Sequence, residues 1–169
     1  MSLNRQGGRL SWMALGLVAG IAIASIWPHE PLRAASSDRN QKFAMVTCQV
    51  GNGYEGVFVL DFLTGRLVGA CLGRVQAVTQ FQYYYLRNVA EDFKVAGQGE
   101  PYYAISAGYA DIQSRGNAQF GASVIYVAEL NSGKVGAYAI PFKIAQQKVA
   151  PVALTPIGDF PFREANIAQ

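Results

Sequence analysis

Two stretches, VFVLDFLTGRLVGA at 57–70 and VIYVAELNSGKVGAYAI at 124–140, decide the fold of this 169-residue chain. Each contains an apolar run, an acidic residue, a short turn sequence that ends in glycine, and a second apolar run. The turn glycines, Gly65 and Gly133, each follow a hydroxyl residue, at a point where reversing the chain requires a positive φ. Each stretch is therefore predicted to form an antiparallel β-hairpin.

The two hairpins match at a fixed spacing, because Glu129 lies 68 residues after Asp61 just as Gly133 lies 68 residues after Gly65. The strand before each hairpin matches as well, with Phe43-Ala44-Met45 and Tyr103-Ala104-Ile105 lying 60 residues apart. Two ordered matches favour an internal duplication over chance. We therefore expect a mainly β fold of antiparallel meanders, arranged as a half-propeller, a sandwich or a barrel-like structure.

Further strand patterns, separated by turn signals, lie around the hairpins. Asn88–Ala96 fits one short helix, with Asn88 as its cap and Glu91 completing a capping box. The domain is expected to span 43–169 and to contain two related units, 43–87 and 102–154. The predicted strands are Phe43–Val50, Gly56–Phe62, Arg66–Leu72, Val75–Arg87, Tyr102–Asp111, Ser123–Leu130, Lys134–Ile140 and Lys148–Leu154.

The N-terminal segment 1–27 contains an uncharged run from Leu10 to Trp27 that is long enough, as a helix of about 27 Å, to cross the hydrocarbon core of a bilayer. Arg5 and Arg9 precede it and place the N-terminus in the cytoplasm. A retained signal anchor is the first reading. The second is a signal peptide cleaved after Ala24. The residues expected to contact the membrane are Leu10, Trp12, Leu15, Leu17, Ile21, Ile23, Ile26 and Trp27.

Residues 28–42 contain two prolines, a serine pair and alternating charges, which is typical of a linker. Both readings of the N-terminus place the domain outside the cytoplasm. The protein is then either a single-pass protein of the cytoplasmic membrane or, after cleavage, a secreted or periplasmic one.

The hairpins resemble the middle hairpins of β-propeller blades of the quinoprotein-like kind, which have an apolar strand, an acidic residue, two further residues, Thr-Gly and a second strand. The resemblance covers about 14 residues in each copy, and the chain has room for only two blades, so it does not imply a complete quinoprotein enzyme. The whole chain resembles a family of uncharacterised exported bacterial proteins with one N-terminal apolar segment and hairpins of this kind. That family implies no activity.

The residues needed for common catalytic sites are missing from the domain sequence. The single histidine, His29, lies in the linker, so no Ser-His-acid or Cys-His arrangement is expected in the domain. Asp61 and Glu129 precede turns and are expected to accept hydrogen bonds from turn amides. No catalytic, cofactor-binding or metal-binding residue is predicted, and the chain is read as a non-enzyme without a cofactor. Ten basic and nine acidic side chains at 40–169 leave no basic face for nucleic acid.

The two cysteines, Cys48 and Cys71, are placed on the first and third strands of one meander. Those strands lie about 9–10 Å apart, whereas a disulfide needs Cα atoms within about 7 Å. Two buried free thiols are therefore favoured over a disulfide.

Aromatic residues alternate along the strand predicted at 75–87. Phe81, Tyr83 and Tyr85 are expected on the core face, with Gln80, Gln82 and Tyr84 on the other. Tyr84 is therefore the best candidate for an exposed contact with a partner.

The function predicted from these features is non-enzymatic: binding to, or assembly with, other envelope or membrane proteins, or self-association. One alternative is a module, or an enzyme, that binds a small ligand or a carbohydrate through an aromatic sheet face. The other is an accessory subunit of a membrane complex. The expected partners are the membrane and envelope proteins or further copies, and nucleic acid is not among them.

Overall fold

The computed structural model describes residues 12–18, 37–39, 42–51, 53–95, 101–112 and 119–163, and the chain forms two compact units, Met1–Arg33 and Ala34–Gln169. In the first unit, residues 12–18 form a helix with exposed side chains. Among the described residues, no helix is both long and apolar enough to cross a membrane. The structure thus does not support the predicted transmembrane helix. Of the residues expected to contact the membrane, only Trp12, Leu15 and Leu17 are described, and Leu10, Ile21, Ile23, Ile26 and Trp27 lie outside the described part.

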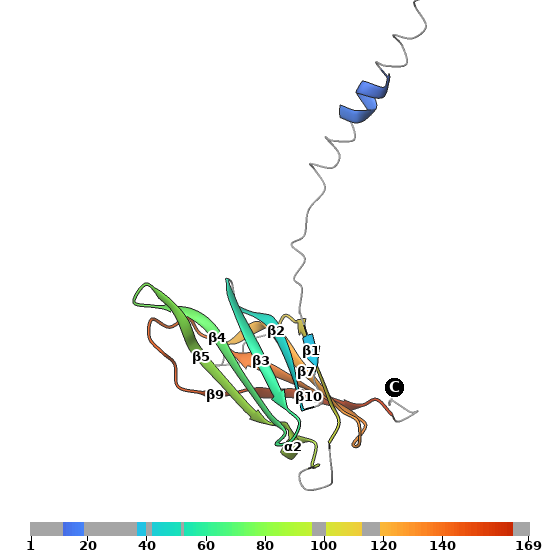
Figure 1. Ribbon diagram of the computed structural model, residues 1–169, viewed down its shortest axis with the longest axis vertical. Coiled ribbons are helices and arrows are strands. Elements are labelled where there is room, and N and C mark those ends of the chain that lie inside the picture. The colour runs from blue at the N-terminus through green and yellow to red at the C-terminus, as the bar shows by residue number, and fades with distance from the viewer. Residues whose placement is uncertain are drawn as a thin grey trace, which may run out of the picture. The chain divides into compact units, whose positions relative to one another are not determined.

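The second unit is mainly β, as predicted, and is built from two largely antiparallel sheets that lie face to face (Figure 1). The first sheet has the strand order β1-β2-β3-β4-β5-β9, and the second has the order β10-β8-β7-β6. The elements are β1 (Ser37–Arg39), β2 (Phe43–Gly51), β3 (Tyr54–Asp61), β4 (Arg66–Val75), β5 (Val78–Asn88), α2 (Val89–Asp92), β6 (Tyr103–Tyr109), β7 (Phe120–Glu129), β8 (Lys134–Pro141), β9 (Val152–Ala153) and β10 (Thr155–Pro161).

Each sheet contains a four-stranded antiparallel meander, β2-β3-β4-β5 in the first and β6-β7-β8-β10 in the second. The first three strands of the two meanders share one register. The corresponding pairs are Phe43–Asp61 and Tyr103–Glu129 between the first two strands, and Asp61–Arg66 and Glu129–Lys134 between the next two. The second meander extends to Pro161, beyond the predicted limit at 154.

One apolar core lies between the sheets. The sheets approach each other at β2, which contacts β6 and β7. An added Cβ at Gly121 of β7 would lie 2.1 Å from the carbonyl oxygen of Val50, so the two backbones touch there. Ser123 Oγ donates to the carbonyl oxygen of Gln49 at 2.6 Å in the same place. The largest fully buried side chains are Tyr85, Tyr103, Tyr138, Phe58, Leu60, Leu67, Ile125, Ile140, Leu154, Gln82, Glu129 and Val46.

The segment after β8 links the two sheets on the side of β5. Phe142 packs against Tyr54 and Tyr83, with ring centroids 5.1 and 5.0 Å away. The chain then runs parallel to β5 as β9 and returns to the second sheet as β10. The predicted strand Lys148–Leu154 is wrong in its extent, because only Val152–Ala153 pairs there.

The β4–β5 hairpin also differs from the prediction. Its turn is Gln76-Ala77, with φ of 50° and 67°, so β4 runs on to Val75 and β5 begins at Val78. The predicted helix over Asn88–Ala96 is shorter, since α2 covers only Val89–Asp92. The side chain of Asn88 makes no capping bond to the backbone and instead donates to Glu91 Oε1 at 2.7 Å.

A β-bulge in β5 corrects the predicted faces of this strand. Cys71 pairs with Tyr83 and Leu72 with Phe81, so Gln82 is an extra residue between the two pairs. The extra residue reverses the alternation on its N-terminal side. Phe81 is therefore exposed and Gln82 fully buried, the opposite of the prediction, whereas Tyr83 and Tyr85 lie in the core as expected.

Candidate interaction surface

The predicted turn residues build two equivalent hairpin ends. Gly65 and Gly133 both have φ of +65°, in the left-handed region expected from the turn sequences. Asp61 Oδ1 accepts the amide of Leu63 at 3.0 Å, and Glu129 Oε1 accepts the amide of Asn131 at 2.9 Å. Both carboxylates therefore hold a turn, which is the structural role expected of them.

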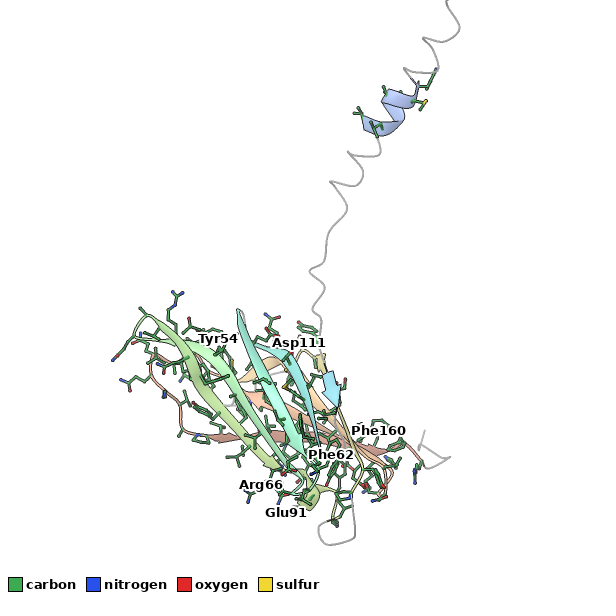
Figure 2. The ribbon with its side chains drawn as sticks, viewed as in Figure 1. Tyr54, Phe62, Arg66, Glu91, Asp111 and Phe160 are labelled. Atoms are coloured by element: carbon green, nitrogen blue, oxygen red, sulfur yellow. The ribbon has the colours of Figure 1, made fainter. Side chains whose placement is uncertain are left out.

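Asp61 also accepts a hydrogen bond from the hydroxyl of Thr64 at 2.6 Å. This bond is the main cause of a lowered pKa of Asp61, with smaller contributions from turn amides. Figure 2 shows Phe62, Arg66 and Glu91 gathered at this end of the domain, while Tyr54 and Asp111 lie at the other end.

The two cysteines lie in one cross-strand row, on either side of Gly56. Cys48 pairs with Gly56 and Gly56 pairs with Cys71, so a whole strand separates the thiols. Both thiols are free and buried. Burial raises the pKa of Cys48 to about 12 and that of Cys71 to about 11. A thiol that stays protonated at neutral pH is a poor nucleophile, so this row belongs to the packing of the core.

The outward side of the first sheet has a row of apolar side chains that crosses five strands. Met45, Val59, Val68, Leu86 and Ala153 are paired in succession from β2 to β9. Met45, Val68 and Leu86 are 37%, 51% and 49% exposed. No part of the described chain covers this row.

A second row lies beside the first on the same side. Thr47, Val57, Ala70 and Tyr84 are paired in succession, and each is half-buried. Tyr84, the predicted contact residue, thus lies within an apolar surface, and its hydroxyl donates to the carbonyl oxygen of Phe81 at 3.2 Å. We call the two rows together the first outer face: Met45, Thr47, Val57, Val59, Val68, Ala70, Tyr84, Leu86 and Ala153.

The second sheet also has an apolar outward side, with smaller side chains. Ala104, Ala128, Val135 and Phe160 form one paired row, and the neighbouring row runs through Tyr126. We call these two rows the second outer face: Ala104, Ser106, Tyr126, Ala128, Val135, Ala137 and Phe160.

The sequence contains a signal for the first outer face that the alternation of residues along 75–87 does not show. Strands covered on one side alternate between apolar and polar residues, whereas strands covered on both sides are apolar throughout. The runs VFVL at 57–60 and LVGACL at 67–72 do not alternate. Such runs indicate that β3 and β4 have two apolar sides.

The described residues include the walls of two surface hollows. One, of about 220 Å³, lies between β5 and the segment after β8 and includes Tyr84 and Phe142 in its wall. The other, of about 490 Å³, is lined by residues of β3, β4 and β5 that include Glu55 and Arg74. The first is smaller than the roughly 300–1,000 Å³ typical of small-molecule sites. Within the described residues, no cluster of three or more His, Cys, Asp or Glu side chains could hold a metal ion.

No known family, curated protein or solved structure matches the chain in sequence or fold. The geometry of the domain therefore carries the functional argument, and its most distinctive part is the first outer face.

Proposed function

We propose that the protein is a non-enzymatic envelope protein whose β domain assembles with another protein through the first outer face. The observation that carries this proposal is the uncovered row Met45–Val59–Val68–Leu86–Ala153. Large continuous apolar patches are uncommon on soluble monomers and mark sites of association. Covering such a row removes apolar surface from water, which is the main driving force of most protein association.

The edges of the first sheet favour contact through its face. The edge strands β1 and β9 have only three and two residues, and other parts of the chain approach the longer strands beside them: β2 contacts β6 and β7, and the backbone carbonyl oxygen of Gln82 in β5 accepts the amide of Val149. An open strand edge is the other route by which a sheet can associate, because its unpaired backbone groups can pair with a further strand. For this sheet, the structure favours the face.

The N-terminal segment supports the location of this activity. The uncharged run behind Arg5 and Arg9 favours a domain held outside the cytoplasm, next to the membrane. The domain would then meet its partners at the membrane surface.

A crosslinking experiment with surface variants tests the proposal. Partners are crosslinked in intact cells, recovered with the tagged full-length chain and identified. Val68→Lys with Leu86→Lys places two charges on the first outer face and should abolish recovery of the specific partner. Leu63→Lys is the matched control, because Leu63 is 87% exposed and lies in the β3–β4 turn. Equal recovery with both variants would contradict a role for this face.

A further inference from the structure

We propose that the partner of the first outer face is a second copy of this chain, which presents its second outer face, so that copies stack front to back and close into a ring. This inference rests on the proposed function and names the partner. The chain already makes the same kind of contact once, between its own two sheets.

The shared register shows which surfaces are equivalent. Phe43 corresponds to Tyr103, Asp61 to Glu129 and Arg66 to Lys134, because each pair occupies the same position in its meander. From these anchors, Met45 of the first outer face corresponds to Ile105, and Val59 corresponds to Val127.

Burial alternates along the strands of both meanders, but a position that is buried in one meander is outward-facing in the other. We call this relation opposite burial phases. Ile105 and Val127 are buried against the first sheet, whereas their counterparts Met45 and Val59 face outward. Conversely, Phe58 of the first sheet is fully buried, and its counterpart Tyr126 is 37% exposed. The front of one meander therefore packs on the back of the other.

This orientation leaves two complementary surfaces with exposed side chains, and the second extends only as far as the row of Tyr126, because Val124 and Ala139 in the next row on that side are buried. In the second sheet, the positions equivalent to the first outer face form the inward side, which packs on the first sheet. In the first sheet, the positions equivalent to the second outer face form the inward side, which packs on the second sheet. A sandwich related by a twofold axis would bury two equivalent faces and leave no such pair. Each copy can therefore place its first outer face on the second outer face of the next.

One contact inside the chain predicts a specific contact between copies. Phe62 packs against Tyr103, with ring centroids 5.9 Å apart. The counterpart of Phe62 is Leu130, and the counterpart of Tyr103 is Phe43. Both counterparts are exposed large apolar side chains, at 44% and 43%. In the assembly, Leu130 of one copy should therefore lie against Phe43 of the next.

Front-to-back contacts are heterologous and produce closed rings when the rotation between subunits permits. The sheets of this domain approach at β2, β6 and β7, while the chain at 142–154 fills the space on the side of β5. Sheets whose first strands lie close together and whose other edges are spread apart can be arranged around a common axis. Closed arrays of four-stranded sheets contain about four to eight of them, so with two per chain a ring would contain about two to four copies.

Charge variants and native mass spectrometry of the full-length chain in detergent test the ring. The wild type should give one closed species of about two to four copies. Val68→Glu disables the first outer face and Tyr126→Glu the second, so each variant should be monomeric. An equimolar mixture should form a dimer with one copy of each and nothing larger, because one intact face of each kind remains. Thermal melting checks that both variants are folded.

Other outcomes overturn the inference in distinguishable ways. If Tyr126→Glu leaves the wild-type oligomer unchanged, the contact joins two equivalent faces. If the wild type is monomeric while Val68→Lys with Leu86→Lys still abolishes recovery of a different protein, the proposed function survives and self-assembly does not. If neither association occurs, both fail.

A thiol crosslink tests the predicted contact. Phe43→Cys and Leu130→Cys chains, mixed and treated with a short dithiol-reactive crosslinker, should give a covalent dimer. Val78→Cys mixed with Leu130→Cys is the control and should give several-fold less dimer, since Val78 is 60% exposed and lies beside the β4–β5 turn, at the far end of the sheet from Phe43. Equal yields would contradict the predicted stacking.

Discussion

At the scale of single residues, the turn glycines distinguish two ways in which an added side chain destabilises the fold: backbone strain and steric overlap. An added Cβ at Gly65 would lie 2.4 Å from Ala90 Cβ, whereas an added Cβ at Gly53 would meet nothing within 4 Å. Both have positive φ. Gly53→Ala should therefore lower the free energy of unfolding by about 1 kcal/mol through backbone strain alone, and Gly65→Ala or Gly65→Val should cost more.

Urea denaturation followed by circular dichroism measures these differences. Gly133→Ala should fall between the two, because its added Cβ meets the flexible side chain of Arg163 at 2.9 Å. Gly158→Ala, where nothing lies within 4 Å and φ is not positive, is the control and should change little. Equal losses at Gly53 and Gly65 would show that the contact with Ala90 is unimportant.

The buried thiols make stability fall at alkaline pH. An unfolded cysteine loses its proton near pH 9, whereas folded Cys71 and Cys48 keep theirs up to about pH 11 and about pH 12. The folded state therefore binds more protons in this window, and the free energy of unfolding should fall by up to about 1.4 kcal/mol per pH unit for each thiol. Below pH 9 the thiols contribute no pH dependence.

Chemical denaturation at several pH values between 8 and about 11 measures this slope. The double variant Cys48→Ala with Cys71→Ala should have a shallower slope than the wild type. It should retain some slope, because burial also raises the pKa of Tyr103 to about 12. Parallel curves for the two proteins would contradict the assignment to the thiols.

At the scale of elements, Gln82 joins the bulge of β5 to the segment that links the sheets. Its side-chain Nε2 donates to the carbonyl oxygens of Ala145 at 2.6 Å and Gln147 at 2.9 Å, and its backbone carbonyl oxygen accepts the amide of Val149. Gln82→Ala leaves two carbonyl oxygens without this donor and should cost about 1–3 kcal/mol.

The loss of stability caused by Gln82→Ala should appear first as local opening of the segment after β8. Hydrogen exchange should accelerate at the amides of Val149 and Leu154, which bond to β5, more than at amides of β2 and β3. Gln80→Ala is the matched control on the same strand and should leave exchange at both amides unchanged. Uniform acceleration across the domain by Gln82→Ala would contradict a local clamp.

The sequence predicted the hairpins and missed the elements that lack a local signal. The 57–70 and 124–140 hairpins have glycine at the turn and were placed within a few residues. The β4–β5 turn has Gln76-Ala77, two residues that rarely take positive φ, so nothing in the sequence marked it. The bulge at Gln82 depends on the segment after β8, a contact between residues more than 60 positions apart. β10 contains two prolines, which are rare inside strands, so no strand was predicted after Leu154.

The candidate surface was predicted only in part for a similar reason. Tyr84 was placed on the outward side of β5, and the structure puts it in the first outer face. Val68 and Leu86 were missed because exposure of an apolar residue depends on which sheet covers it. The opposite burial phases of the two meanders arise from how the sheets pack. Aligning the two repeats in sequence shows which positions are equivalent but not which side of each sheet is buried.

At the scale of the whole molecule, the sequence predicts that the N-terminal run sets where the domain works. If Leu10–Trp27 anchors the protein, the intact chain should pellet with membranes and resist carbonate extraction, because an uncharged segment of this length is stable in the hydrocarbon core. Protease added outside the cytoplasmic membrane should cut the domain. Placing two arginines at Leu17 and Ile21 should release the chain from the membrane fraction. A mature N-terminus at Ser25 would instead establish a cleaved signal peptide.

The opposite burial phases of the two meanders also have a genetic consequence. A ring assembled front to back needs both outer faces of every member, so one defective copy leaves a gap that no neighbour can fill. A Val68→Glu allele expressed beside the wild type should therefore be dominant. A Val68→Glu copy keeps its second outer face, so it can occupy the first outer face of a wild-type copy and prevent the ring from closing. A recessive Val68→Glu allele would indicate that each copy works by itself.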